Sequence, residues 1–316
     1  MSSLWPTPSS TQMFVAVARC GKRHVHNVTR GAVSIRAVVS DLDGTLLGPD
    51  KCVSARTLEA VRKIRRNGIL FIPASGRSSS GMFSAMGELG QDLLRDGSPF
   101  ISMNGLTVHG QGEGGGYGKI IFHTIMCPRL AMRVVDFWKK HRFAGAAGVS
   151  LCGSCGDTVV VERLDERTQR YVDWKEPKPE EVGSFKDAIT GGLQLNRLYF
   201  CGPSRSAVDA FKGDLEEHLK DYPKELTRGM GEMIEVLPPG SSKAVGLEAL
   251  LKEVGIPAEE VMALGDEDND IEMLRAVGHG VAMGQASISV RKAARYTAPS
   301  NALDGVAVAL ETFCGV

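Results

Sequence analysis

At 316 residues, with 43% hydrophobic and 23% charged side chains, the chain is long enough for two domains that each have a core. Lys plus Arg and Asp plus Glu both number 37, so charge gives no argument for a nucleic-acid or membrane partner. The longest apolar runs are too short to cross a bilayer, and no membrane-spanning segment is predicted.

Residues 1–34 differ in composition from the rest of the chain. They are rich in Ser and Thr, they contain basic but no acidic side chains, and they have one brief apolar patch at 13–18. This profile is typical of an organelle transit peptide rather than of a secretory signal, and a disordered extension is the alternative. We therefore expect an intracellular protein, located in the cytoplasm or, if the segment is cleaved, in a plastid or mitochondrion.

The seven cysteines lack the spacing of a disulfide framework, which favours a reducing compartment. Cys152 and Cys155 are the only close pair. A structural zinc ion needs four ligands, and no second pair stands nearby, so neither a zinc site nor a redox role is predicted for them.

The first strong structural signal is the run Arg36–Asp43, which is apolar and β-branched at its centre and predicts a buried strand. Asp41 and Asp43 come at its carboxyl end, where α/β proteins place ligands, and Gly44 allows a sharp turn. Side chains two residues apart in a strand point to the same side, so the carboxylates of Asp41 and Asp43 would lie together if the strand continues. A cation between the two carboxylates, or a proton on one of them, would relieve their repulsion. The alternative is that the segment is only a turn, in which Asp and Gly are common.

The next elements continue a parallel sheet. Ser54 is a plausible helix cap, and the helix that follows ends near Gly68. A second strand is predicted at 69–72. Ser75 and Gly76 follow it, and their hydroxyl group and flexible backbone could bind an anion. A third strand is predicted at 99–103. Strand, helix, strand, helix and strand in this order indicate a wound parallel sheet.

The pattern then changes to a second α/β unit, predicted over 108–238 as an insertion into the first. It opens with a hairpin whose tip is rich in glycine, and Glu176–Pro179 is predicted as a surface loop. Its other predicted elements are strands at 147–151, 158–161, 195–200 and 233–237 and helices over 128–138 and 205–219.

From residue 239 the first unit resumes. Lys243 starts a helix, and a buried strand at 261–264 ends in the acidic cluster Gly265–Asp270. Short strands are predicted at 280–284 and 295–297, before a final helix from Asp304. The predicted fold class is α/β, with a doubly wound, mainly parallel Rossmann-like core formed by 35–107 and 239–316 and an inserted α/β cap domain at 108–238.

The acidic strand ends suggest a metal. Carboxylate sites without Cys or His suit Mg²⁺, which usually binds through few carboxylates together with a phosphate. An EF-hand calcium loop starting at Asp266 is the rival interpretation. It fails because the sixth position is Ile271 rather than Gly and the twelfth is Val277 rather than Glu.

Four short motifs, in this order, resemble those of the haloacid dehalogenase superfamily: Asp-x-Asp-Gly-Thr from Asp41, Ser-Gly-Arg from Ser75, the lone Lys243, and Gly-Asp-x-x-Asn-Asp from Gly265. Because the insertion lies between the second and third motifs, the chain resembles the Cof-type sugar-phosphatase branch. The resemblance covers residues 35–313. One departure is Gln285, where this branch more often has Asn.

The resemblance implies a role for each motif residue. Asp41 would form an aspartyl phosphate, and Asp43 would act as general acid and base. Mg²⁺ would be bound by Asp41, the backbone carbonyl of Asp43 and Asp266, with Asp270 in support. The groups expected to hold the phosphoryl oxygens are the Leu42 amide, Ser75, the Gly76 backbone, Lys243 and Asn269.

The expected function is hydrolysis of small phosphorylated metabolites, above all sugar phosphates, by a phosphatase. A phosphosugar mutase using the same site and a non-catalytic phosphosugar-binding regulator are the alternatives. Hexose and pentose phosphates, flavin mononucleotide and pyridoxal phosphate stay open as substrates. Arg163, Arg197 and the predicted loop 152–157 are only polar positions near predicted strand ends. The sequence does not predict the oligomeric state.

Overall fold

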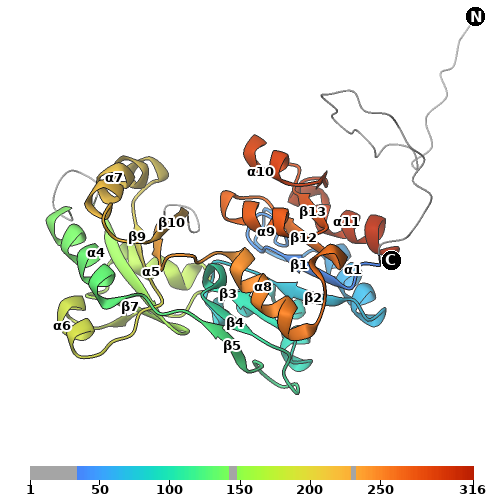
Figure 1. Cartoon of the computed structure of the whole chain (residues 1–316), viewed down its shortest axis with the longest axis horizontal. Helices are drawn as coiled ribbons and strands as arrows, with labels where there is room; N and C mark the ends of the chain where they lie inside the picture. Colours follow the sequence, from blue (N-terminus) through green and yellow to red (C-terminus); the bar gives the residue numbers. More distant parts are fainter. Residues whose placement is uncertain (1–33, 142–147, 229–232) are drawn as a thin grey trace, which may run out of the picture. The chain divides into compact units, whose positions relative to one another are not determined.

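The computed structural model describes residues 34–141, 148–228 and 233–316, apart from the side chains of Arg170 and Tyr171. The extension predicted over residues 1–34 lies outside this part except for Ser34. At the centre is a five-stranded parallel sheet in the order β14-β13-β12-β1-β2 (Figure 1). Its strands are β1 Ala37–Ser40, β2 Leu70–Pro73, β12 Val261–Gly265, β13 His279–Ala282 and β14 Tyr296–Thr297.

Both faces of this sheet are buried because its side chains alternate between two apolar clusters. Val38 packs in the cluster of α1 Ala55–Arg66, α2 Ser79–Met86, α3 Glu88–Arg95 and α11 Gly305–Cys314. Its neighbour Val39 packs in the cluster of α8 Lys243–Val254, α9 Ile271–Ala276 and α10 Ile288–Ala293. Coverage on both faces explains why these strands are apolar runs rather than alternating ones. This arrangement confirms the predicted doubly wound α/β core.

The third predicted strand does not extend the parallel sheet. β3 (Phe100–Ser102) touches β2 through one parallel bridge, between Ala74 and Ile101, and heads a separate antiparallel sheet with β4 (Thr107–His109) and β5 (Ile120–His123). The reason is local, since the short 3-10 turn Met103–Gly105 (η1), with φ of +56° at Asn104 and +90° at Gly105, folds β4 straight back on β3.

The position of this hairpin changes where the inserted domain is placed to begin. The sequence placed the start of the insertion at residue 108, inside β4. In the structure Val108 lies in the core cluster with Ile101 and Leu247 of α8. We therefore propose that the inserted unit begins after β5, near Thr124.

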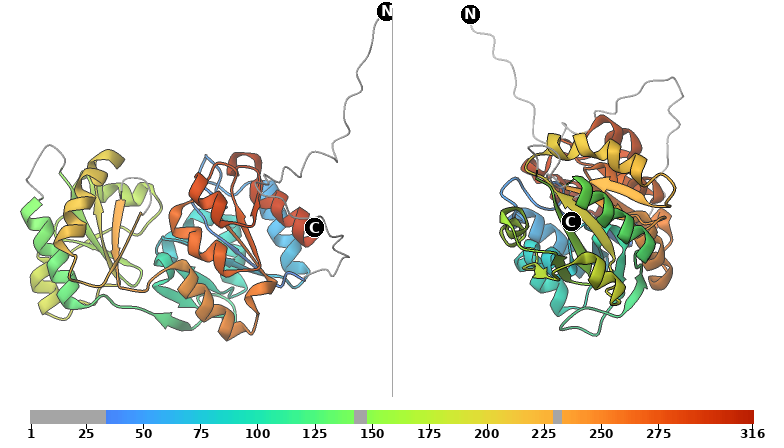
Figure 2. Two further views of the ribbon diagram at one scale, coloured as in Figure 1. Left: turned by 45° about the horizontal axis from the view of Figure 1, so that its top comes forward. Right: turned by 90° about the vertical axis from the view of Figure 1, so that its left-hand side faces the viewer.

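The inserted cap domain contains a six-stranded sheet in the order β10-β11-β9-β6-β7-β8. Its strands are β6 Ser150–Cys155, β7 Thr158–Val161, β8 Glu180–Glu181, β9 Arg197–Cys201, β10 Glu225–Arg228 and β11 Met233–Leu237. Three helices, α4 Pro128–His141, α6 Phe185–Thr190 and α7 Arg205–His218, pack on one face with Leu198, Phe200 and Ile234. Figures 1 and 2 show these helices gathered on one side of the strands.

The opposite face of the cap sheet carries the alternate residues of the same strands. Tyr199, Cys201 and Met233 form a smaller apolar cluster there with Cys152, Val159 and Val161. Arg197 and Glu235 share this face by the same alternation, and the segment after α5 (Glu166–Asp173) packs its Trp174 on the cluster.

Two local expectations in the cap were wrong. The strand predicted at 147–151 runs instead from Ser150 to Cys155, so most of the predicted loop 152–157 is strand; residue 147 lies outside the described residues. The segment Glu176–Pro179 is not simply a surface loop, because the Glu176 side chain is buried against the core.

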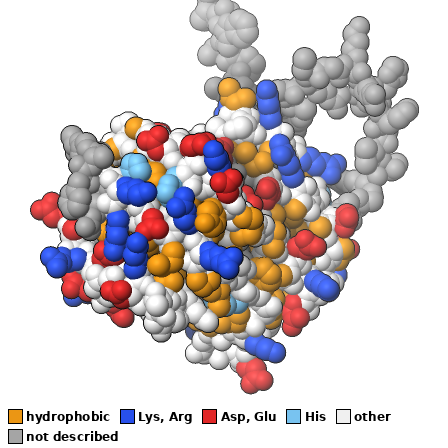
Figure 3. Space-filling model, turned by 60° about the vertical axis from the view of Figure 1, so that its left-hand side comes forward, with side chains coloured by type: hydrophobic (Ala, Val, Ile, Leu, Met, Phe, Trp, Pro, Cys, Tyr) orange, Lys and Arg blue, Asp and Glu red, His pale blue; other side chains and the backbone are white. Residues whose placement is uncertain are grey.

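The remaining short elements are the 3-10 turns η2 Ala258–Glu260, η3 Asp268–Asp270 and η4 Asn301–Leu303. Within the described ranges, every helix is too short or too polar to cross a membrane. On the face shown in Figure 3, basic and acidic side chains are interspersed, with hydrophobic side chains between them.

Candidate active site

Asp41 and Lys243 form the centre of the site. Asp41 directly follows β1, and its amide extends the sheet by donating to the carbonyl of Leu264 at 3.0 Å. Lys243 is the first residue of α8, which Ser242 caps through a hydrogen bond from the Val245 amide. The Lys243 Nζ lies 2.5 Å from Asp41 Oδ1 and 2.7 Å from Asp270 Oδ1. The helix start thus delivers one buried cation between two buried carboxylates.

Three carboxylates converge here, one after β1 and two after the neighbouring strand β12. One oxygen from each of Asp41, Asp266 and Asp270 lies within 4.8 Å of the others. Burial raises the pKa of Asp41 well above its ordinary value despite the charge of Lys243. Burial also raises the pKa of Asp266, to about 6, with Asp270 and Glu267 adding to it against the hydrogen bond from Thr45. A single lysine leaves this group short of positive charge.

Asp266 and Asp270 are held in place by backbone and side-chain donors. Asp270 Oδ2 accepts from the amides of Asp266 and Glu267 at 2.9 and 3.1 Å, and Asp266 Oδ1 accepts from Thr45 Oγ1 at 2.8 Å. Gly44, with φ of +84°, passes so close to Asp266 that a Cβ there would overlap its carboxylate. The glycine of the first motif is therefore required by packing against the last motif as well as by the turn.

Gln285 takes part in the same support. Its Nε2 donates to the Gly44 carbonyl at 2.5 Å and reaches Asp266 Oδ2 at 3.4 Å. Gln285, at the position where the Cof-type branch more often has Asn, thus contacts Asp266 of the acidic cluster through its side-chain amide.

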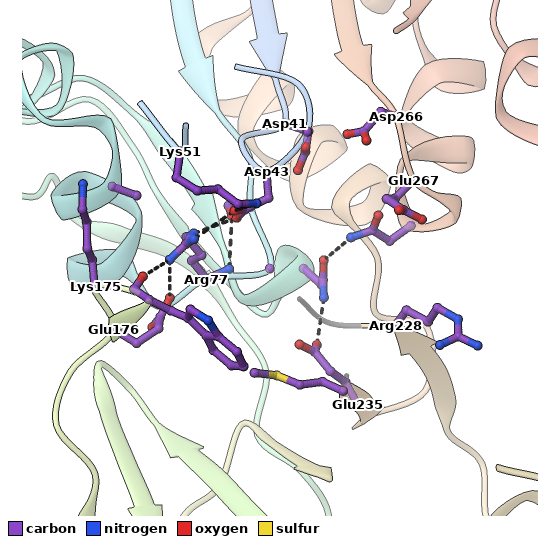
Figure 4. Close-up of a pocket in the computed structure, with 18 of the residues that line it drawn as sticks. Asp41, Asp43, Lys51, Arg77, Lys175, Glu176, Arg228, Glu235, Asp266 and Glu267 are labelled. Atoms are coloured by element: carbon purple, nitrogen blue, oxygen red, sulfur yellow. Dashed lines mark hydrogen bonds and ion pairs between the residues drawn. The ribbon is translucent and has the colours of Figure 1, made fainter. Parts of the chain in front are cut away.

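Asp43 is held apart from this cluster. Arg77 Nε and Nη2 donate to its two carboxyl oxygens at 2.7 and 2.9 Å, and Lys51 lies 3.6 Å away. Burial acts to raise the pKa of Asp43, but the hydrogen bonds and charge of Arg77 outweigh it, and the pKa lies below its ordinary value. Figure 4 shows Arg77 between Asp43 and Glu176, with Asp41 nearer to Asp266. The two aspartates of the first motif therefore face different partners.

The other predicted site residues lie around the same cavity, of about 550 Å³, which Ser75, Gly76 and Asn269 line. Ser75 Oγ accepts from the amide of Arg77 at 3.1 Å, and Asn269 Nδ2 donates to Asn104 Oδ1 at 3.0 Å. Leu42 is fully buried next to Asp41, and its carbonyl accepts from the amides of Thr45 and Leu47.

Several cap residues join this cavity that sequence reasoning did not identify. Glu176 Oε2 accepts from Ser78 Oγ at 2.6 Å, and Glu235 accepts from Asn104 Nδ2 at 2.9 Å. Arg197, noted only as a polar position, donates to Glu235 and to the Gly76 carbonyl. A usable signal for Glu235 was its place as a lone acid in a buried strand, Met-Ile-Glu-Val-Leu.

The remaining polar positions named from the sequence are not brought to the site. Arg163 is exposed and does not line the cavity. Cys152 is buried, and its Sγ lies 3.9 Å from that of Cys201 on the neighbouring strand rather than against Cys155. Burial raises the pKa of the Cys152 thiol, which disfavours the thiolate form that reacts with electrophiles or binds metals.

Comparison with known proteins identifies the family. The profile of the haloacid dehalogenase-like hydrolases matches residues 38–310, almost the whole described part of the chain. The chain belongs to this family. The predicted resemblance is therefore confirmed, and the converging motifs are those of a haloacid dehalogenase-like hydrolase.

Curated relatives are similar over most of this haloacid dehalogenase-like chain. The 5-amino-6-(5-phospho-D-ribitylamino)uracil phosphatase YitU of Bacillus subtilis is 27% identical over 87% of this chain and 96% of its own length. The chloroplastic endoribonuclease YBEY of Arabidopsis thaliana is 26% identical over 86% of this chain. The match spans only 45% of that longer protein.

Solved structures show the same fold. A haloacid dehalogenase-like hydrolase from Bacteroides thetaiotaomicron superposes with a TM-score of 0.75 at 28% identity, covering 88% of this chain and 99% of the other.

Proposed function

We propose that this chain is a Mg²⁺-dependent phosphomonoester hydrolase that acts on small phosphorylated metabolites, with sugar phosphates as a principal class. The observation that carries the proposal is the meeting in one cavity of Asp41, held by buried Lys243, with a second carboxyl, Asp43, held separately by Arg77. One carboxylate for bonding to phosphorus and another for moving a proton are what a two-step hydrolysis needs.

In the first step, a carboxylate oxygen of Asp41 attacks phosphorus, and the bond from phosphorus to the leaving oxygen breaks. Asp43 gives its proton to that oxygen as it leaves. Lys243, Ser75, the Gly76 backbone, the Leu42 amide and Asn269 hold the phosphoryl oxygens. Fixed donors of this kind stabilise charge that is spread over a phosphoryl group in transfer.

In the second step, water attacks the aspartyl phosphate on Asp41. Asp43, now ionised, takes a proton from that water, and inorganic phosphate leaves with Asp41 restored. The lowered pKa of Asp43 beside Arg77 favours the ionised form that this step requires. The first step requires the protonated form, so the negative charge of the bound phosphate must raise this pKa when the substrate binds.

The acidic cluster fits a Mg²⁺ ion. The grouped donors of Asp41, Asp266 and Asp270 are carboxylate oxygens, which this cation prefers, and their charge exceeds that of Lys243. When bound, the ion supplies positive charge that brings the Asp41 carboxylate and an anionic phosphoryl group together. The name of the YitU relative, a phosphatase for a phosphorylated ribityl compound, supports a small phosphorylated metabolite as substrate.

Replacement of the nucleophile tests the proposal. Asp41→Asn should lower phosphate release by about 10⁴-fold or more while leaving the circular dichroism spectrum unchanged, because an amide oxygen is a poor nucleophile. The matched control is Asp50→Asn, an exposed aspartate on the following turn, which should retain activity. Phosphate release by Asp41→Asn would contradict the assignment. Isomer formation without phosphate release would identify a mutase, and binding without either would identify a regulator.

A further inference from the structure

Asn104, in the turn between β3 and β4, contacts two of the segments that carry expected phosphate-binding groups. Its backbone amide donates to the Ser75 carbonyl at 2.9 Å, and a Cβ on Gly76 would lie 3.1 Å from its Nδ2. Its Oδ1 accepts from Asn269 Nδ2 at 3.0 Å. Asn104 is only 2% exposed, so one buried side chain joins the segment of Ser75 to that of Asn269.

The backbone of this turn is closely packed. Asn104 has a φ of +56°, in the left-handed region that residues other than glycine seldom adopt. Gly105 passes so close to the Ser242 carbonyl, just before Lys243, that a Cβ there would overlap it. Backbone in such a conformation persists where the surrounding structure holds it. The position of the Asn104 side chain is therefore fixed, and the direction in which its amide faces is what its partners decide.

Glu235 of the cap decides that direction. It is 3% exposed, and its Oε2 accepts from Asn104 Nδ2 at 2.9 Å. Arg197 Nη1 donates to both of its oxygens at 2.9 Å. Because a carboxylate only accepts hydrogen bonds, the Asn104 nitrogen must face Glu235, which leaves Oδ1 for Asn269. The dashed lines that lead upward from Glu235 in Figure 4 follow this chain.

The direction of the Asn104 amide in turn decides how Asn269 lies. Only the Asn269 nitrogen can donate to Asn104 Oδ1, and this nitrogen carries a second hydrogen. Asn269 lines the cavity, and phosphoryl oxygens accept hydrogen bonds, so its nitrogen is the end that can hold one. If the chain ran in the opposite direction, Asn269 would turn its carbonyl oxygen to Asn104 and move its nitrogen away.

We propose, on the basis of the proposed function, that Glu235 and Asn104 are positioning residues for phosphate binding. Glu235, paired with Arg197, fixes the direction of the Asn104 amide, and Asn104 directs the second N–H of Asn269 to a phosphoryl oxygen. The cap thus acts on the phosphate site of the core in addition to lining the cavity.

Binding of inorganic phosphate to the full chain with Mg²⁺ tests this role, because phosphate has no leaving group for the cap to contact. Glu235→Gln keeps the shape of the side chain but allows the amide chain to reverse, so the Kd measured by calorimetry should rise by about 10-fold. Asn269→Ala should raise it by a similar factor. Glu248→Gln, at an exposed position of α8 outside the cavity, is the matched control and should leave the Kd unchanged.

Combining the two changes shows whether Glu235 acts through Asn269. If it does, the double variant should bind phosphate about as weakly as Asn269→Ala alone, whereas independent effects would multiply to about 100-fold. Asn104→Gly suits the left-handed backbone and removes the link without changing the ion pair of Glu235 with Arg197. It should also raise the Kd by about 10-fold.

An unchanged Kd in Glu235→Gln or in Asn104→Gly, with a native circular dichroism spectrum, would overturn the inference and leave the proposed function standing. Multiplied effects in the double variant would do the same. So would a wild type that releases phosphate from p-nitrophenyl phosphate but binds no inorganic phosphate. A wild type that neither binds nor releases phosphate would overturn both.

Discussion

The core sheet and the cap sheet differ in how their faces are covered. In the core, residues of alternate sides such as Val38 and Val39 pack under helices on both faces, so the chemistry lies at the strand ends. In the cap, helices cover the face of Leu198 and Phe200, while Tyr199 on the other face belongs to a smaller cluster that Trp174 joins beside the cavity. The doubly covered sheet offers only its edge to a ligand, whereas the second face of the cap sheet contributes Arg197, Met233 and Glu235 to the cavity lining.

This difference suggests a division of work. In the proposed function, the core residues Asp41, Asp43 and Lys243 carry phosphoryl transfer, and the cap residues that line the same cavity contact the leaving group. Variants in the core should therefore lower kcat or the free energy of unfolding strongly. Variants in the cap should change kcat/KM by smaller factors. The following experiments test that comparison.

After Asp41→Asn, the largest loss of turnover is expected from a change at Asp43. Asp43→Asn removes the proton donor and acceptor, so kcat should fall by about 10³-fold, as is typical when general acid–base catalysis is lost. Because the cluster of Asp41, Asp266 and Asp270 is intact, Mg²⁺ affinity measured by calorimetry should be retained. Loss of Mg²⁺ affinity would instead place the Asp43 carboxylate on the metal.

Lys243 should show a large effect on stability. Lys243→Met leaves Asp41 and Asp270 buried without their cation, and the free energy of unfolding in urea with EDTA should fall by about 3 kcal/mol. Lys252→Met, at an exposed position of the same helix, is the control and should change it little. Similar losses in both variants would show that the buried pairing is not what stabilises the core.

A smaller effect is expected from the cap at Glu176. Glu176→Gln keeps the shape of the side chain but removes its charge beside Arg77 and weakens its contact with Ser78, so kcat/KM should fall by about 10-fold. Glu180→Gln, an exposed glutamate nearby, should leave kcat/KM unchanged. A loss as large as that of Asp43→Asn would mean that the cap shares in the chemistry.

The smallest effect concerns pH. Burial raises the pKa of Asp266 to about 6 from an ordinary 3.8, so the folded metal-free protein holds this proton more tightly than the unfolded chain. The stability from this group is greatest at low pH and is lost as pH rises to about 6. In EDTA, Asp266→Asn should reduce the decline in unfolding free energy over this interval, whereas exposed Asp268→Asn should not. An identical pH dependence in wild type and Asp266→Asn would contradict the assignment.

Most strands and helices of the core, and the positions of the motif residues at their ends, were predictable because each depends on a short stretch of sequence. The β-branched run before Asp41 forms β1, Ser54 caps α1, and Lys243 starts α8. The course of β3 was not predictable from its apolar character, because a turn through Asn104 and Gly105 decides whether the chain crosses over or folds back. The strand at Cys152–Cys155 was missed because Gly and Ser there favour a loop.

The amino-acid sequence was sufficient to name the two aspartates, the lysine and the acidic cluster and to place them at strand ends or helix starts, since such positions follow from local pattern. It could not show that Arg77 holds Asp43, that Glu176 is buried 98 residues away from its partner Ser78, or that Glu235 meets Asn104 across 131 residues. These contacts form only in the folded chain, where residues of the cap meet residues of the core. No local propensity encodes a pairing between side chains so far apart in the sequence.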